Sequence, residues 1–143
     1  MLAGQLALIV ASLFTGAAIY ISVAEQPARL LLDDRAALSE WQPAYSRGAA
    51  MQASLAIVGF GLGLLAWWQS GDARWLLGAL MLIANWPYTF AFIMPTNRRL
   101  QAADPAQAGP TTGALLRRWG ALHAGRSLLG CGAVFVMLWA SVA

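Results

Sequence analysis

Long apolar blocks alternate with short polar segments along this chain, and the lengths of the apolar blocks match the thickness of a membrane. About 20 apolar residues in a helix cross a hydrocarbon core of roughly 30 Å. Four blocks reach this length, at about residues 2–24, 49–69, 75–94 and 115–142. The pattern therefore predicts an all-α fold with four transmembrane helices, in a single integral membrane domain that covers residues 1–143.

The polar segments between these blocks predict how the helices connect. Residues 70–74 (Ser-Gly-Asp-Ala-Arg) are typical of a tight turn. Residues 25–48 contain Trp41 and Tyr45 and predict a short interfacial segment between the first two helices, with both aromatic rings at headgroup level. Residues 95–114 are rich in Ala, Pro, Gly and Thr and predict a mobile loop. These connections favour an up-down-up-down bundle.

Composition and charge agree with a membrane protein and indicate its orientation. Only 10% of the residues are charged and 59% are hydrophobic, whereas a soluble domain carries roughly 25% charged residues. All nine cations are arginine, and they form no basic stripe of the kind that binds nucleic acid. Seven arginines fall in the two long connections or directly beside them: Arg29, Arg35, Arg47, Arg98, Arg99, Arg117 and Arg118. The short turn contains only Arg74, so the positive-inside rule places both termini outside and both long loops in the cytoplasm of a bacterial inner membrane.

The second apolar block contains the pattern Gly59-x-x-x-Gly63. Such a pair is typical of close helix–helix approach. Glycine is also common in membrane helices in general, so the pattern leaves both interpretations open.

Polar side chains gather near the predicted cytoplasmic ends of the four helices, where an ionisable group is costly unless it faces the bundle interior. Trp119, His123 and Arg126 have the spacing i, i+4, i+7, which places them on one helical face. Arg126 lies about 12 Å deeper than Arg118, at ~1.5 Å per residue, and needs a partner. Glu25 is the nearest carboxylate at a helix end, so we expect a Glu25–Arg126 pair with His123 beside it.

Two interpretations of this polar cluster remain open at the level of sequence. It is either a site for chemistry or ligand binding, or an ion pair that locks the four helices in register. His123 is the only histidine, and a metal held by His123 and Glu25 is a minor alternative to a metal-free site. Cys131 is the only cysteine, and the chain has neither a Walker loop nor a Rossmann glycine pattern. We therefore expect no organic cofactor.

The order of motifs along the chain resembles the anthrone-oxygenase-like family of small four-helix integral membrane proteins. The resemblance covers nearly the whole chain and rests on four groups of residues: Gly16, Tyr20, Glu25 and Pro27; Trp41 and Tyr45; Trp86, Pro87, Ile93, Pro95, Asn97 and Leu100; and Trp119, His123 and Arg126. Some fungal members of this family oxidise an anthrone to an anthraquinone with molecular oxygen and without a recognised organic cofactor, whereas most bacterial members have no assigned activity. The resemblance therefore does not imply a particular substrate.

The resemblance also implies that Glu25, Asn97, His123 and Arg126 form the family's polar pattern. The leading hypothesis is an oxidase or oxygenase in which His123 is the general base, Arg126 and Asn97 stabilise the substrate oxygen, and Glu25 orients His123 or Arg126. The residues expected to bind the lipophilic aromatic substrate are Tyr20, Trp41, Tyr45, Tyr88 and Trp119. The alternatives are a non-enzymatic protein that binds a lipid, quinone or small acid, or takes part in its transport, and a structural subunit. The expected partners are the lipid bilayer and a lipophilic small molecule, with homo-oligomerisation left open.

Overall fold

The computed structural model describes all 143 residues and contains four long helical rods and no strand. The first rod comprises α1 (Leu2–Tyr20), η1 (Ile21–Glu25) and α2 (Gln26–Arg29), and the second is α3 (Asp34–Ser70). The third comprises α4 (Ala73–Ile83), α5 (Asn85–Tyr88), η2 (Thr89–Ile93) and α6 (Met94–Ala102), and after a short turn, η3 (Pro105–Gln107), the fourth is α7 (Pro110–Val142). Each rod is long and apolar enough to cross a membrane. The prediction of an all-α fold with four spanning helices is confirmed.

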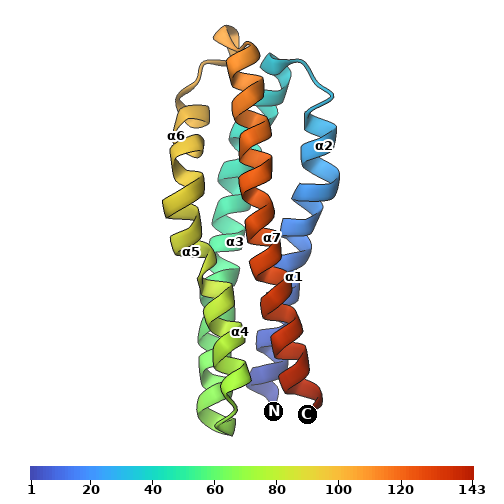
Figure 1. Ribbon diagram of the computed structural model, residues 1–143, viewed down its shortest axis with the longest axis vertical. Helices are drawn as coiled ribbons and strands as arrows, with labels where there is room; N and C mark the ends of the chain where they lie inside the picture. The colour runs from blue at the N-terminus through green and yellow to red at the C-terminus, as the bar shows by residue number, and fades with distance from the viewer.

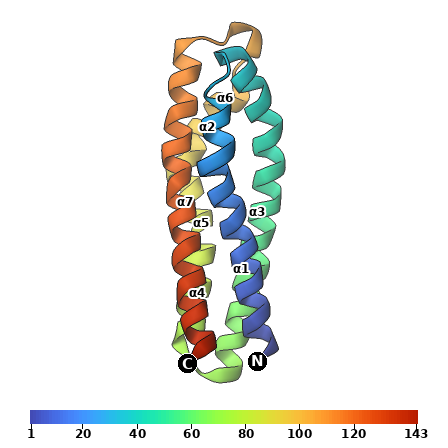
Figure 2. The same cartoon turned by 90° about the vertical axis from the view of Figure 1, so that its right-hand side faces the viewer.

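The rods run alternately up and down and form a closed ring. Figures 1 and 2 show both termini and the α3–α4 turn at one end of the bundle, and the other two connections at the opposite end. Around the ring, α1 packs against α3 and α7, and α4 packs against the same two helices. We call the part of the bundle with the termini the terminal half and the other part the connection half. The seven arginines of the long connections therefore share one end, as predicted.

The connection half is more helical than the sequence indicated, and two predictions about it were wrong. No interfacial segment separates the first two rods, because α3 begins at Asp34 and continues through Trp41 and Tyr45 for 37 residues, about 55 Å at 1.5 Å per residue. Asp33 starts this helix by accepting a hydrogen bond from the backbone N–H of Ala36 at 2.9 Å. Trp41 is fully buried among the helices of the bundle, so its ring is not on the outer surface.

The predicted loop over residues 95–114 is also largely helical. α6 continues to Ala102 and α7 begins at Pro110, so the connection spans only residues 103–109. Pro110 lies in the first turn of α7, directly after Gly109. A proline is accepted there because its missing N–H has no partner within the helix at that position.

The turn between α3 and α4 is built by two consecutive residues, Gly71 and Asp72. Gly71 ends α3 in the left-handed conformation, with φ of 71°, and donates its backbone N–H to the carbonyl of Trp67 at 2.7 Å. Asp72 then caps α4 by accepting from the backbone N–H of Arg74 at 2.9 Å. Its hydrogen bonds with Arg74 hold the pKa of the Asp72 carboxyl below its usual range. The predicted tight turn is confirmed.

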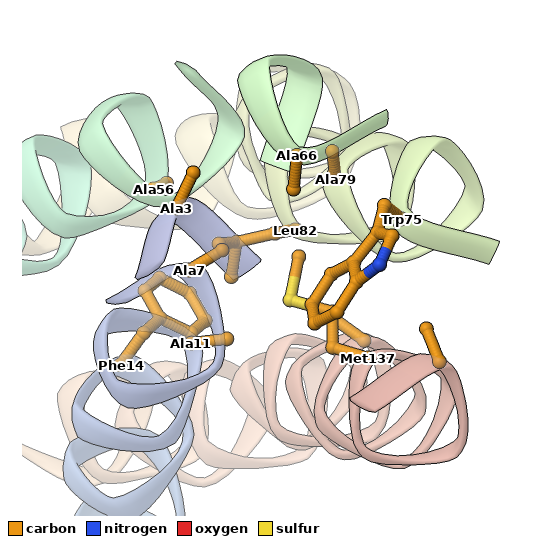
Figure 3. Packing of buried hydrophobic residues seen from close by; sticks show 12 residues of the cluster. Ala3, Ala7, Ala11, Phe14, Ala56, Ala66, Trp75, Ala79, Leu82 and Met137 are labelled. Atoms are coloured by element: carbon orange, nitrogen blue, oxygen red, sulfur yellow. The ribbon is translucent and has the colours of Figure 1, made fainter. Parts of the chain in front are cut away.

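Small side chains form the core of the terminal half, which Figure 3 shows from close by. Eight of the twelve residues in this cluster are alanine, and Phe14, Trp75 and Met137 fill the space between them. A Cβ atom added to Gly59 would lie 2.4 Å from Leu82, and one added to Gly63 would lie 2.7 Å from the Cβ of Ala79. The Gly59-x-x-x-Gly63 pattern is therefore the contact surface of α3 with α4, and its interpretation as a close helix–helix approach is confirmed.

Candidate functional site

Buried polar atoms without a hydrogen-bond partner are concentrated around two cavities in the bundle. Nine side chains contain such an atom, and seven of these side chains line one or both cavities. The first cavity has a volume of about 230 Å³ and lies among the first rod, α3 and α7. The second has a volume of about 140 Å³ and lies between α3 and the segment from α5 to α6, with one α7 residue in its wall. Four residues border both cavities: Tyr45, Ala49, Gln52 and Arg126.

His123 lines the first cavity from α7 and is only 2% exposed. Its ring lies against Trp119, with the ring centroids 4.9 Å apart. Its Nδ1 is 3.4 Å from the hydroxyl of Ser22, which in turn is 3.1 Å from the hydroxyl of Ser127. Nε2 has no partner. If Nδ1 carries the hydrogen and donates it to Ser22, Nε2 is left with a lone pair that can accept a proton.

Arg126 lies one helical turn further along α7 and has no counterion. It is 7% exposed, its guanidinium lies 5.6 Å from the centre of the Phe14 ring, and its Nε has no hydrogen-bond partner. No carboxylate is within ion-pair distance of it. Burying an unpaired cation is costly, so an anionic or strongly polar ligand group is the natural partner for this side chain.

The predicted Glu25–Arg126 pair is wrong, because Glu25 is bound to Arg29. Arg29 forms ion pairs with both Glu25 and Glu40, and its guanidinium also donates to the amide oxygen of Gln26 at 2.5 Å. The first rod continues to Arg29, so Glu25 and Arg29 lie one turn apart on the same helix. Glu25 still borders the first cavity. No group of three or more His, Cys, Asp or Glu side chains is placed to hold a metal ion.

Asn97 reaches the site through Tyr45 and lines neither cavity. Its side-chain N–H donates to the Tyr45 hydroxyl at 2.5 Å, and Asn97 is 1% exposed. Because that hydroxyl accepts a hydrogen bond from Asn97, its own hydrogen is free to be donated elsewhere. Tyr45 borders both cavities.

Four of the five aromatic residues expected to bind substrate line the first cavity. Trp41 stacks on Tyr45 with centroids 4.7 Å apart, and Trp119 meets both rings edge-on. Tyr20 is 58% exposed and stands at the outer margin of the cavity. Tyr88 lines neither cavity. Its hydroxyl instead donates to the carbonyl of Leu122 at 2.6 Å, over the space that a side chain at position 125 would need.

A π-helical turn forms part of the wall of each cavity. η1 contributes Ile21 and Glu25 to the first, and η2 contributes Thr89 and Phe90 to the second. In both rods a proline follows two residues after the π-helical turn. A proline ring inside an α-helix clashes with the carbonyl group four residues earlier, and the wider π-helical turn provides room for it. Single π turns of this kind are frequent at functional sites.

Several residues of the site were not singled out from the sequence. Ser22, Arg29 and Glu40 look like ordinary polar residues near helix ends until the first rod is seen to continue to Arg29. Asn85 and Thr89 carried a stronger signal, because both are polar residues within the third apolar block.

A family model described as "Anthrone oxygenase" matches residues 41–136, which is more than half of the chain. The matched region includes Tyr45, Asn97, His123 and Arg126, and it begins after Glu25. No curated protein and no solved structure matches the chain.

Proposed function

The chain belongs to the anthrone oxygenase family, and from this premise we propose that it is a membrane-embedded oxygenase or oxidase for a lipophilic, anthrone-like aromatic substrate. The observation that carries the proposal is the pair of unpartnered groups in one cavity: Nε2 of His123 and the guanidinium of Arg126. A base and a cation side by side are what removal of a proton beside a carbonyl group requires.

The substrate enters from the bilayer into the first cavity. Tyr20 and Met51, which border it, are 58% and 51% exposed on the outer surface of the bundle. The volume of about 230 Å³ exceeds the roughly 150 Å³ of an apolar cavity that holds benzene, so the space suits a fused ring system better than a single ring. Trp41 and Trp119 supply flat apolar surfaces for it.

In the first step Nε2 of His123 takes a proton from the acidic C–H of the substrate. The Ser22 hydroxyl lies within hydrogen-bond distance of Nδ1 and can accept its hydrogen in the tautomer that leaves Nε2 free to act as the base. The negative charge moves to the substrate oxygen, where the Arg126 guanidinium and the Tyr45 hydroxyl stabilise it. Asn97 is a positioning residue, because it turns the Tyr45 hydroxyl by donating to it. Glu25 orients Arg29 and has no direct part in the proton transfer.

The resonance-stabilised carbanion then reacts with molecular oxygen. The C–H carbon gains a C–O bond to give a hydroperoxide, which loses one molecule of water and leaves a carbonyl group. Dioxygen supplies both the new oxygen atom and the oxidising equivalents, so anthrone plus O₂ gives anthraquinone plus water. No organic cofactor takes part in this scheme.

The test is oxygen consumption by the purified protein with anthrone in detergent, measured against protein-free micelles. His123→Gln keeps a polar side chain of similar size but lacks the base, and we expect it to lower the rate by at least about 100-fold. Its thermal unfolding should stay close to that of the parent protein. Full activity in this folded variant would remove His123 as the base.

The unpaired Arg126 equally suits a protein that binds an acidic amphiphile or a quinone without reaction. Native mass spectrometry separates this second candidate from the first. A retained small acid or quinone, together with no oxygen consumption above that of empty micelles, would favour binding or transport over catalysis.

We further propose that both termini face outside and the connection half faces the cytoplasm of a bacterial inner membrane. The seven arginines at the connection end support this orientation, against Arg74 alone at the terminal end. In a Cys131→Ser background, an impermeant maleimide should label Ser70→Cys in intact cells and Gln107→Cys only after the cells are permeabilised. The reverse pattern would contradict the orientation.

A further inference from the structure

We propose that the second cavity is a separate ligand site that takes one aromatic ring bearing a hydroxyl group, held by Asn85, Thr89 and Arg126 beside the rings of Trp86 and Phe90. This site lies beside the first cavity along α3 and shares Tyr45, Ala49, Gln52 and Arg126 with it, while its own walls come from α5 and η2. It does not depend on whether the first cavity is catalytic.

The polar atoms of the second cavity are buried and have no partner within the protein. Asn85 is 1% exposed, and its amide N–H donates to the carbonyl of Leu82 at 3.0 Å, which leaves Oδ1 as an unused acceptor. The Thr89 hydroxyl and the Trp86 indole N–H are also unpartnered. Because leaving such groups unpaired is costly, a ligand that supplies a hydroxyl donor to Asn85 has a clear advantage over a hydrocarbon.

Arg126 adds charged hydrogen-bond donors to the cavity in which Asn85 supplies an acceptor. It borders the second cavity as well as the first, and no carboxylate of the protein neutralises it. A phenol-class oxygen accepts readily from a guanidinium, and the hydrogen bond is strengthened because the donor is charged. The acceptor on Asn85 and the donors on Arg126 and Trp86 together match a ring with oxygen substituents.

The size and the remaining walls of the cavity limit the ligand to about one ring. Its volume of about 140 Å³ is close to the roughly 150 Å³ that accommodates benzene. Trp86 and Phe90 face it with ring centroids 5.9 Å apart, and Ala53 and Ala56 line it from α3. Phe90 is 57% exposed at the outer surface, so the site is open towards lipid beside η2.

The methionines of the chain allow the site to be mapped directly. Cyanogen bromide cleaves after methionine, so cleavage at Met81 and Met94 releases residues 82–94, a fragment that lines the second cavity and not the first. The probe is 4-azidophenol, photolysed with the full-length protein in detergent, and the readout is the label on each fragment by mass spectrometry. We expect the fragment 82–94 to be labelled. Azidobenzene, which lacks the hydroxyl and enters micelles more readily, should label it about ten-fold less.

Two matched variants of α3 separate the cavities. Ala53 lines only the second cavity and Ala44 only the first, and both side chains are partly exposed. Ala53→Phe should fill the second cavity and lower the label on the fragment 82–94 by about ten-fold, while Ala44→Phe should leave it unchanged. Asn85→Leu, which removes the acceptor and keeps the side-chain size, provides the same test if Ala53→Phe does not fold.

Two results would overturn the proposal: equal labelling of the fragment 82–94 by the two probes, or labelling that persists in both Ala53→Phe and Asn85→Leu. Because photolabelling needs no turnover, the outcome is independent of the proposed activity. Hydroxyl-dependent label in a protein that consumes no oxygen would leave this site standing and remove the oxygenase. Oxygen consumption without label on the fragment 82–94 would leave the oxygenase standing and remove this site.

Discussion

The terminal and connection halves of the bundle are built from the same four rods but use opposite means of packing. In the terminal half, alanine and glycine bring the helix backbones together around Phe14, Trp75 and Met137. In the connection half, the packed cluster is smaller and contains the large rings of Trp41 and Trp119, and it borders the first cavity. Buried polar atoms without partners are absent from residues 1–14 and 127–143 and are frequent in the connection half.

The difference indicates how a small membrane protein can hold a costly site. Close packing of small side chains between helices supplies stability in lipid without polar contacts. That stability allows the rest of the bundle to keep an unpaired guanidinium, a free imidazole nitrogen and two open cavities, each of which disfavours folding. Stability and function are thus separated along the bundle axis.

A substitution that crowds the terminal half is the most direct test of the difference between the two halves. In Gly63→Ala the new Cβ lies 2.7 Å from the Cβ of Ala79, which has no flexible end that could move aside. We expect a loss of about 2 kcal/mol in the free energy of unfolding, measured by titration with SDS in mixed micelles. Gly61→Ala is the matched control on the same helix, because nothing lies within 4 Å of its added Cβ. It should be neutral or stabilising by about 0.5 kcal/mol, and equal losses in the two variants would show that α3 and α4 do not depend on this contact.

The fold could be predicted from the sequence wherever the surrounding lipid or water determines which residues are apolar and which are polar. The length of each apolar block gave the four rods, and Gly71 and Asp72 gave the turn between α3 and α4. Outside the apolar blocks the same reasoning failed. Residues 25–48 were expected to form a short interfacial segment and residues 95–114 a mobile loop, yet most of them extend the rods as helix. The length of an apolar block indicates where a helix crosses the membrane, but it does not indicate where that helix ends.

The candidate site was only partly predictable, for a related reason. The spacing of Trp119, His123 and Arg126 on α7 depends on one helix alone, and the structure places all three residues on the first cavity. The partner of Arg126 depends on how far the first rod continues. Once that rod reaches Arg29, Glu25 pairs with this nearer cation, and Arg126 is left without a carboxylate partner. The second cavity depends on how α3 and the segment from α5 to α6 are placed relative to each other, which no pattern within a single segment describes.

A comparison of two arginines, one in each half, tests the smallest of the expected effects. Arg126 is buried without a counterion, so Arg126→Met should raise the free energy of unfolding by about 1 kcal/mol while it abolishes oxidation or ligand binding. Arg74 bonds to Asp72 and lies 4.9 Å from the centre of the Trp139 ring, so Arg74→Met should lower stability and leave activity unchanged. Both variants would be measured by SDS titration and by oxygen consumption. A lower stability for Arg126→Met with no loss of ligand binding would mean that Arg126 locks the helices, and the two halves would then serve the same structural purpose.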